Sequence, residues 1–203
     1  MISRYALASS LVVTKFLAIL SLLALLSPGV VAQSVPELPQ VGGGGETPDF
    51  PIKMVSGGPR ESSGDAAVEM KLSSLNGRVV LLDVFSSKCP HCIDHAPRVA
   101  EFYKQFRQQG FTVVGLATDQ PDRAADVTSF IATAGITYPV GFMSAEVMVY
   151  FLDRRNHGVP QMVLFGKDGK MAKRLVGWSE TTGPELRAAI EAELVKPAPR
   201  AVR

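Results

Sequence analysis

The sequence has few of the residues that build metal centres: two cysteines, three histidines and one tryptophan in 203 residues. Two cysteines cannot complete a structural zinc site of four thiolates. The 21 basic and 19 acidic residues form no long block of one sign, so the chain lacks the basic patch of a nucleic-acid-binding protein. The two cysteines are the most informative feature of this sequence.

Long apolar runs are also scarce. Residues 16–26 form one near the N-terminus, but a membrane-spanning helix needs about 20 residues. Two basic residues precede this run, a Ser-Pro-Gly break follows it, and small residues end at Ala32. We predict that residues 1–32 are a signal peptide, with an uncleaved membrane anchor as the alternative. The protein is therefore expected in the periplasm or another extracytoplasmic space, touching the membrane only if this segment is retained.

Three further segments follow the signal. Residues 33–48 are rich in proline and glycine, as is typical of a flexible tether. Residues 49–196 carry the alternating patterns of strands and helices and are predicted to form one α/β domain. Residues 197–203 are a Pro/Arg-rich tail that we expect to be disordered.

The domain is expected to be a central mixed β-sheet with helices on both faces. Period-two alternation predicts an N-terminal hairpin, and continuous apolar runs predict buried strands. Apolar residues three and four apart predict the helices. The expected strands are residues 50–54, 68–72, 79–85, 111–116, 161–165 and 170–176, with an extended piece at 136–140; the expected helices are 92–109, 124–134, 145–151 and 182–194.

The cysteines stand three residues apart, as Cys89-Pro90-His91-Cys92, between an apolar strand and an amphipathic helix. That placement is typical of a dithiol/disulfide redox couple. A disulfide that closes so short a loop would stabilise the fold by only about 2 kcal/mol, so a purely structural role is disfavoured. We expect Cys89, at the positive end of the helix dipole, to be the attacking thiolate and Cys92 the buried resolving thiol.

Two neighbours are expected to tune this couple. His91 can stabilise a thiolate at Cys89, which would make the protein a stronger oxidant. Asp83 is the single acid of the strand at 79–85, and a carboxyl buried there could exchange a proton with the resolving thiol. The alternative for Asp83 is a structural position at a polar edge or beside a lysine.

Together these residues resemble the thioredoxin superfamily. The shared features are a CxxC that opens a helix, the acid six residues before it, Pro97 inside that helix, and Val159-Pro160 before a strand. The tether, the N-terminal hairpin and a central helical insert at about 118–150 are similar to the exported TlpA/ResA-like thiol-disulfide oxidoreductases. The resemblance covers residues 47–195 and implies a thioredoxin-like fold and no prosthetic group.

The same resemblance implies which residues meet a client protein. Pro160 is expected to be a cis proline facing the cysteines, and Val159 and Gln161 to flank the client's backbone. Pro90 and His91 complete this expected binding surface. The implied function is reduction of disulfides in exported proteins, with a membrane or periplasmic partner supplying the electrons.

Three alternative functions can be weighed against this one on the basis of the sequence. The Pro-His dipeptide is similar to that of DsbA, an oxidant that introduces disulfides. The two thiols could instead carry Cu(I) with help from His91, His95 or His157, although His95 and His157 are expected at the surface. A peroxiredoxin shares the fold, but Leu82 stands where that family needs proline, and only Ser86 fits its pattern.

Overall fold

The computed structural model describes residues 49–55, 69–152, 155–156 and 158–198, all within a compact unit that spans Val41–Arg203. The predicted signal peptide, the tether, most of the C-terminal tail and His157 lie outside the described residues, as does the loop of the N-terminal hairpin. No helix in the described part of the chain is long and apolar enough to cross a membrane.

Seven strands in the described residues form one mixed sheet, ordered β2-β1-β5-β4-β3-β6-β7. Its centre is parallel, with β3 beside β4 and β4 beside β5, while the other neighbours pair antiparallel. The strands are β1 (Pro51–Met54), β2 (Glu69–Lys71), β3 (Val79–Phe85), β4 (Phe111–Ala117), β5 (Val140–Phe142), β6 (Gln161–Phe165) and β7 (Met171–Val176). The mixed sheet and the N-terminal hairpin are thus confirmed.

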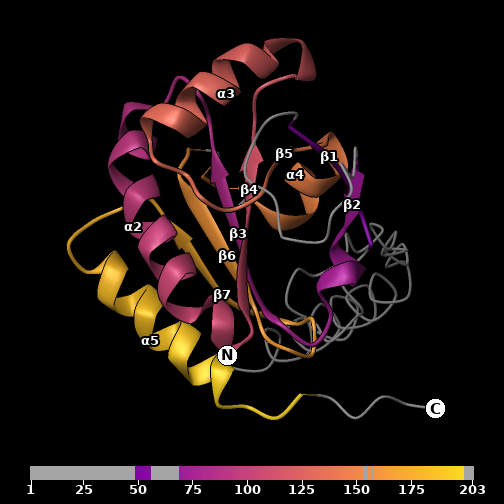
Figure 1. Cartoon of the computed structure of the whole chain (residues 1–203), viewed down its shortest axis with the longest axis vertical. Helices are drawn as coiled ribbons and strands as arrows, with labels where there is room; N and C mark the ends of the chain where they lie inside the picture. The colour runs from indigo at the N-terminus through magenta and orange to yellow at the C-terminus, as the bar shows by residue number, and fades with distance from the viewer. Residues whose placement is uncertain (1–48, 56–68, 153–154, 157, 199–203) are drawn as a thin grey trace, which may run out of the picture. The chain divides into compact units, whose positions relative to one another are not determined.

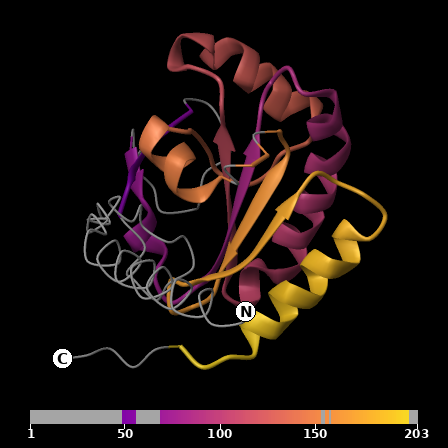
Figure 2. The ribbon, with the colours of Figure 1, turned by 180° about the vertical axis from the view of Figure 1, so that it is seen from behind.

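Helices cover both faces of the sheet, as expected. The helices α2 (Pro90–Phe106), α3 (Ala124–Thr133) and α5 (Thr182–Leu194) lie on one face, and α4 (Ala145–Phe151) lies on the other (Figures 1 and 2). Short 3₁₀ turns η2 (Leu72–Leu75), η3 (Arg107–Gln109) and η4 (Pro121–Arg123) connect these elements. We call the two sides the α2 face and the α4 face.

Alternation along β3 divides the core between these faces. Val79, Leu81 and Phe85 belong to the cluster on the α2 face, whereas the intervening residues Val80, Leu82 and Val84 belong to the cluster on the α4 face. Every residue of β3 is buried, because both faces are covered by helices. The alternation directs Asp83 to the α2 face, beneath the helix that begins at the cysteines.

Two elements have boundaries that differ by more than one residue from the predicted ones. The helix expected at 92–109 begins two residues earlier, at Pro90, and its last turn is the 3₁₀ turn η3 before Gly110, which has a φ of 92°. The extended piece expected at 136–140 becomes a strand only from Val140. The residues before it cross from α3 back to the sheet and place Tyr138 in the core.

Candidate redox site

The two cysteines stand at the N-terminal end of α2 and form a disulfide, with Cα atoms 5.2 Å apart. Cys89 is the N-cap residue, and its Sγ accepts a hydrogen bond of 3.2 Å from the backbone N–H of Cys92. Pro90 takes the first helical position, where a missing N–H costs nothing. Cys92 is fully buried, whereas Cys89 is partly exposed. The helix therefore presents one sulfur to solvent and encloses the other.

The loop that leads to Cys89 is fixed by an acid from the neighbouring strand end. Ser87 donates from its backbone N–H and its hydroxyl to the two carboxylate oxygens of Asp119, at 2.8 and 2.5 Å. The residues meet because β3 and β4 are parallel, so their C-terminal ends lie at the same edge of the sheet. The backbone N–H of Cys89 also donates to the carbonyl of Ser86 at 3.1 Å. These hydrogen bonds fix the backbone of residues 86–89, which leads from β3 to the disulfide.

A proline loop faces the exposed cysteine. The Val159–Pro160 peptide bond is cis, as the resemblance implied. The Sγ of Cys89 lies 3.5 Å from the carbonyl oxygen of Val159, which is partly exposed, while Pro160 is buried. Pro90 and His91, which follow Cys89 at the start of α2, are exposed. The structure thus brings together the cysteines and the residues that were expected to border a client.

Gln161 takes a different position. Its side chain is fully buried, and its Nε2 donates to the carbonyls of Asn156 and Gly158 at 2.6 and 2.9 Å. These bonds tie β6 to the loop that precedes the cis proline. The residue can therefore shape the client-binding surface through the backbone of that loop.

A buried polar cluster lies on the α2 face. Asp83, His95 and Tyr138 are each 0% exposed. The Nε2 of His95 lies 2.7 Å from Oδ1 of Asp83, and the hydroxyl of Tyr138 donates to Oδ2 at 2.5 Å. Gly115, paired with Asp83 across β3 and β4, leaves room for this arrangement, because a Cβ there would lie 3.2 Å from the Tyr138 ring. Asp83 is therefore placed by two partners from distant parts of the chain.

The electrostatics of this cluster favour a charged pair with a neutral phenol. Burial lowers the pKa of His95, but the charge of Asp83, their hydrogen bond and the carbonyls of His91 and Cys92 raise it by more, so it lies above its ordinary value. Burial and the Asp83 charge hold the pKa of Tyr138 well above its usual range. The Nδ1 of His95 faces the helix backbone but makes no hydrogen bond of good geometry within the described residues.

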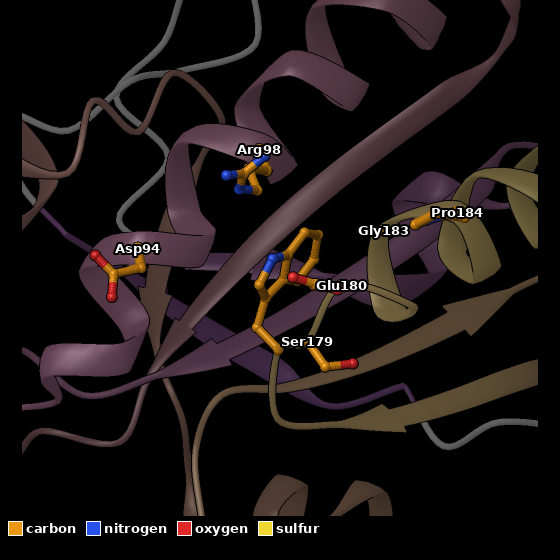
Figure 3. Close-up of a pocket in the computed structure, with 7 residues that line it drawn as sticks. Asp94, Arg98, Ser179, Glu180, Gly183 and Pro184 are labelled. Atoms are coloured by element: carbon orange, nitrogen blue, oxygen red, sulfur yellow. The ribbon is translucent and has the colours of Figure 1, made fainter.

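Trp178 lies over His95. The centres of the two rings are 5.9 Å apart. The indole also lines a surface groove to which α2 contributes Asp94 and Arg98, and to which the loop after β7 contributes Ser179 and Glu180 (Figure 3). Trp178 also packs against the apolar cluster on this face.

Comparisons with known proteins identify the family. Residues 44–190 match the model of the AhpC/TSA family. The chain belongs to this family. It is 25% identical over 151 residues to the thiol-disulfide oxidoreductase ResA of Bacillus thuringiensis (strain Al Hakam), an alignment that covers 73% of this chain and 76% of that protein.

Solved structures show the same fold. A candidate protein disulfide isomerase of Bacteroides thetaiotaomicron superposes with a TM-score of 0.62 and 26% identity, over 75% of this chain and 90% of that one. A candidate thiol:disulfide interchange protein DsbE of Chlorobium tepidum gives a TM-score of 0.61 at 24% identity, over 73% and 95%. The thioredoxin-like fold and the assignment as a thiol-disulfide oxidoreductase are confirmed.

Two members of the polar cluster were missed or misplaced from sequence. His95 was expected at the surface and is fully buried, so that expectation was wrong. Its spacing carried the signal, since it lies three residues after the buried Cys92 and four before the buried Val99. Tyr138 gave no such signal, because it lies in an irregular crossover. Among the described residues, no group of three or more His, Cys, Asp or Glu side chains could hold a metal ion.

Proposed function

We propose that this protein reduces disulfides in exported proteins through the Cys89–Cys92 dithiol. The position of Cys89 carries the proposal. Its partly exposed sulfur accepts a hydrogen bond from the N–H of Cys92, which favours a thiolate there in the reduced protein. The same sulfur lies beside the carbonyl of Val159, where an extended client segment could pair with the backbone.

The exchange proceeds in two balanced steps. The Cys89 thiolate attacks one sulfur of a client disulfide, forming the Cys89–client bond and releasing the other client sulfur as a thiolate. Cys92, as a thiolate, then attacks the Cys89 sulfur and displaces the second client thiolate. The Cys89–Cys92 disulfide re-forms, two electrons have passed to the client, and the released client thiolates take protons from water.

The remaining site residues support these steps. Val159 offers its backbone groups to the client, and Pro160, which has no N–H, shapes the loop opposite Cys89. Pro90 and His91 border the exposed sulfur. The side chain of Gln161 holds the loop before Pro160 through its hydrogen bonds to the carbonyls of Asn156 and Gly158. Asp83 influences the proton equilibrium of Cys92 from the same face of the sheet.

Two considerations support a reductant at an extracytoplasmic site. The ResA-like architecture, with an N-terminal hairpin and a central insert at about 118–150 that contains α3 and β5 and most of α4, is the one that we associate with reduction. The first 32 residues have the pattern of an export signal. A protein that reduces clients there needs electrons from a membrane or periplasmic partner, so we propose that such a partner reduces the Cys89–Cys92 disulfide after each cycle.

One observation favours the opposite direction as a second candidate. His91 is exposed beside the N-cap sulfur, where a protonated imidazole stabilises the Cys89 thiolate. Stabilising the reduced form makes a couple more oxidising. A strong enough effect would turn the protein into an oxidant that introduces disulfides.

The reduction potential distinguishes these two functions. We would equilibrate the chain from Gln33 onward with glutathione and measure the fraction of reduced Cys89–Cys92. A value near about −270 mV, as in thioredoxin, supports the reductant, whereas about −120 mV, as in DsbA, identifies an oxidant. Failure of the pair to equilibrate with glutathione would contradict both.

Trapping separates the roles of the cysteines. In Cys92→Ala, clients should accumulate as mixed disulfides on Cys89, because no resolving thiol remains. The matched variant Cys89→Ala should trap little, since Cys92 is buried. Efficient trapping on Cys92 in that variant would reverse the assignment.

A further inference from the structure

Both oxygens of the buried Asp83 carboxylate already have hydrogen-bond partners. Oδ1 of Asp83 is paired with His95, and Oδ2 accepts from Tyr138. An ionised carboxylate only accepts hydrogen bonds, so both partners act as donors. Tyr138 keeps its proton, because the pKa of a phenol so buried lies well above its usual range. His95 is then the member of the cluster whose charge can change.

We propose that His95 is a positioning residue of the redox couple, which in its protonated form balances the charge of Asp83 and stabilises the reduced state of Cys92. This inference rests on the proposed thiol-disulfide exchange and adds a proton-linked control to it. His95 lies three residues after Cys92 on the buried stripe of α2, so the two side chains are neighbours on one helix face.

The groups around His95 make the sign of the effect clear. Within the described part of the chain, the charged group paired with His95 is Asp83 from β3, and Tyr138 is neutral. Trp178, from the loop after β7, adds no charge, and the charged side chains Asp94, Arg98 and Glu180 line the groove that Trp178 also borders. The Asp83–His95 pair is therefore neutral when His95 is protonated and has a charge of −1 when it is not.

The charge of the Asp83–His95 pair takes effect when the Cys89–Cys92 disulfide is reduced. A thiolate of a dithiol donor attacks Sγ of Cys89, the Cys89–Cys92 bond breaks, and Cys92 leaves with the electron pair. The second donor thiolate then attacks the first donor sulfur and displaces Cys89, so the donor becomes a disulfide and both cysteines are left as thiolates. A neutral pair beside Cys92 tolerates its negative charge, whereas a pair with charge −1 opposes it.

Protonation of His95 and reduction of the disulfide are thermodynamically linked, so the effect of one on the other can be measured. If the charge of His95 favours reduction, reduction must raise the pKa of His95 by the same free energy. The equilibrium constant with glutathione then changes about tenfold for each pKa unit of that rise as His95 titrates. A merely structural role for His95 would shift this constant equally at every pH.

The test compares the full chain with His95→Gln, whose amide can still donate to Asp83 but does not titrate. The equilibrium constant with glutathione would be measured between about pH 5 and pH 9, where imidazoles and thiols titrate. We expect the ratio of the two constants to change with pH, and a constant ratio would overturn the inference. The same comparison is made in a His91→Gln background, which removes the exposed imidazole beside Cys89, and there the ratio should change with pH in the same way. If the wild-type protein fails to exchange at all, the proposed function fails instead.

A second measurement needs no buried substitution. The three imidazoles of the chain can be followed by NMR in the oxidised and reduced protein, with His91→Gln and His157→Gln assigning the other two. The ring current of Trp178, centred 5.9 Å from His95, should set that signal apart. We expect the His95 titration to move to higher pH on reduction. Equal midpoints in the two redox states, or no titration of His95, would overturn the inference.

Discussion

The two faces of the central sheet use the same strand for different purposes. Leu82 and Asp83 are neighbours on β3, both 0% exposed, yet one joins an apolar cluster on the α4 face and the other an acid–imidazole–phenol cluster on the α2 face. Apolar burial stabilises a fold without regard to direction, whereas a buried acid is tolerated only with donors placed on its oxygens. Both faces therefore stabilise the sheet by apolar burial, and the α2 face in addition buries a hydrogen-bonded carboxyl group.

The largest test of this division removes an aromatic ring from the α4 face. Phe151 is 0% exposed, and its ring centre lies 5.3 Å from that of Phe165 and 6.0 Å from that of Phe50. Phe151→Ala should lower the free energy of unfolding by about 3–5 kcal/mol, through lost burial and the cavity that remains. Denaturant titration measures the loss, and the glutathione equilibrium of the folded protein should not change.

The neighbouring Val149 provides the control, because it is 64% exposed on the same helix. Val149→Ala should change stability by no more than about 0.5 kcal/mol. A shift of the redox equilibrium in Phe151→Ala would show that changes on the α4 face affect the redox site, which would contradict the separation of the two faces.

Much of this arrangement was predictable from the sequence because it depends on local patterns. The apolar run of β3, the strand at Gln161–Phe165 and the helix at Ala145–Phe151 occur where their periodicity placed them. The cysteine pair was predictable for the same reason, since a strand, a CxxC and a helix follow one another directly. The cis Val159–Pro160 bond followed only from the family resemblance, because most X-Pro bonds are trans.

The polar cluster was less predictable because its partners are distant in sequence. Asp83 and Tyr138 are 55 residues apart, and nothing local to Tyr138 indicates that its hydroxyl reaches β3. His95 was misjudged because a lone helix histidine is usually solvated, although its place in the buried stripe of α2 argued otherwise. Which side chains from different elements meet depends on how those elements pack in three dimensions, and a single sequence does not specify that packing.

The next test is the steric fit of two glycines in strands. A Cβ on Gly115 would lie 3.2 Å from both Tyr138 and Phe85 on the α2 face, so Gly115→Ala should cost about 1–3 kcal/mol of stability by overpacking. Because the crowded Tyr138 ring carries the hydroxyl that donates to Asp83, a small displacement of this ring should shift the glutathione equilibrium as well. Unfolding and redox titrations on the same sample measure both effects.

Gly141 in β5 is the matched control for the opposite face. A Cβ there would collide with the side chain of Ile52, which belongs to the α4 cluster, and lie 2.9 Å from the carbonyl oxygen of Lys53. Gly141→Ala should therefore destabilise the protein at least as much as Gly115→Ala and leave the redox equilibrium alone. Equal redox shifts in the two variants would contradict the separation of the faces.

A smaller effect is expected from one hydroxyl. Tyr138→Phe removes the donor to Oδ2 of Asp83 and preserves the ring, so stability should fall by about 1–2 kcal/mol, the cost of a buried acceptor left unpaired. Tyr150→Phe on α4 is the control and should change stability by less than about 0.5 kcal/mol. If the two variants unfold alike, the hydroxyl of Tyr138 does not stabilise the buried carboxylate.

The smallest expected effect is the pH dependence of stability, because a single proton on His95 produces it. Folding raises the pKa of His95 through Asp83, so the stabilisation is fully present below the unfolded value of about 6.5 and is lost as pH rises through the folded value. Its size is about 1.4 kcal/mol for each pKa unit of that rise. The difference in unfolding free energy between the wild type and His95→Gln, measured across this range, isolates it from the other titrating groups. A difference that does not fall with rising pH would mean that His95 is neutral in the folded protein, and the α2 face would then carry an uncompensated buried carboxylate.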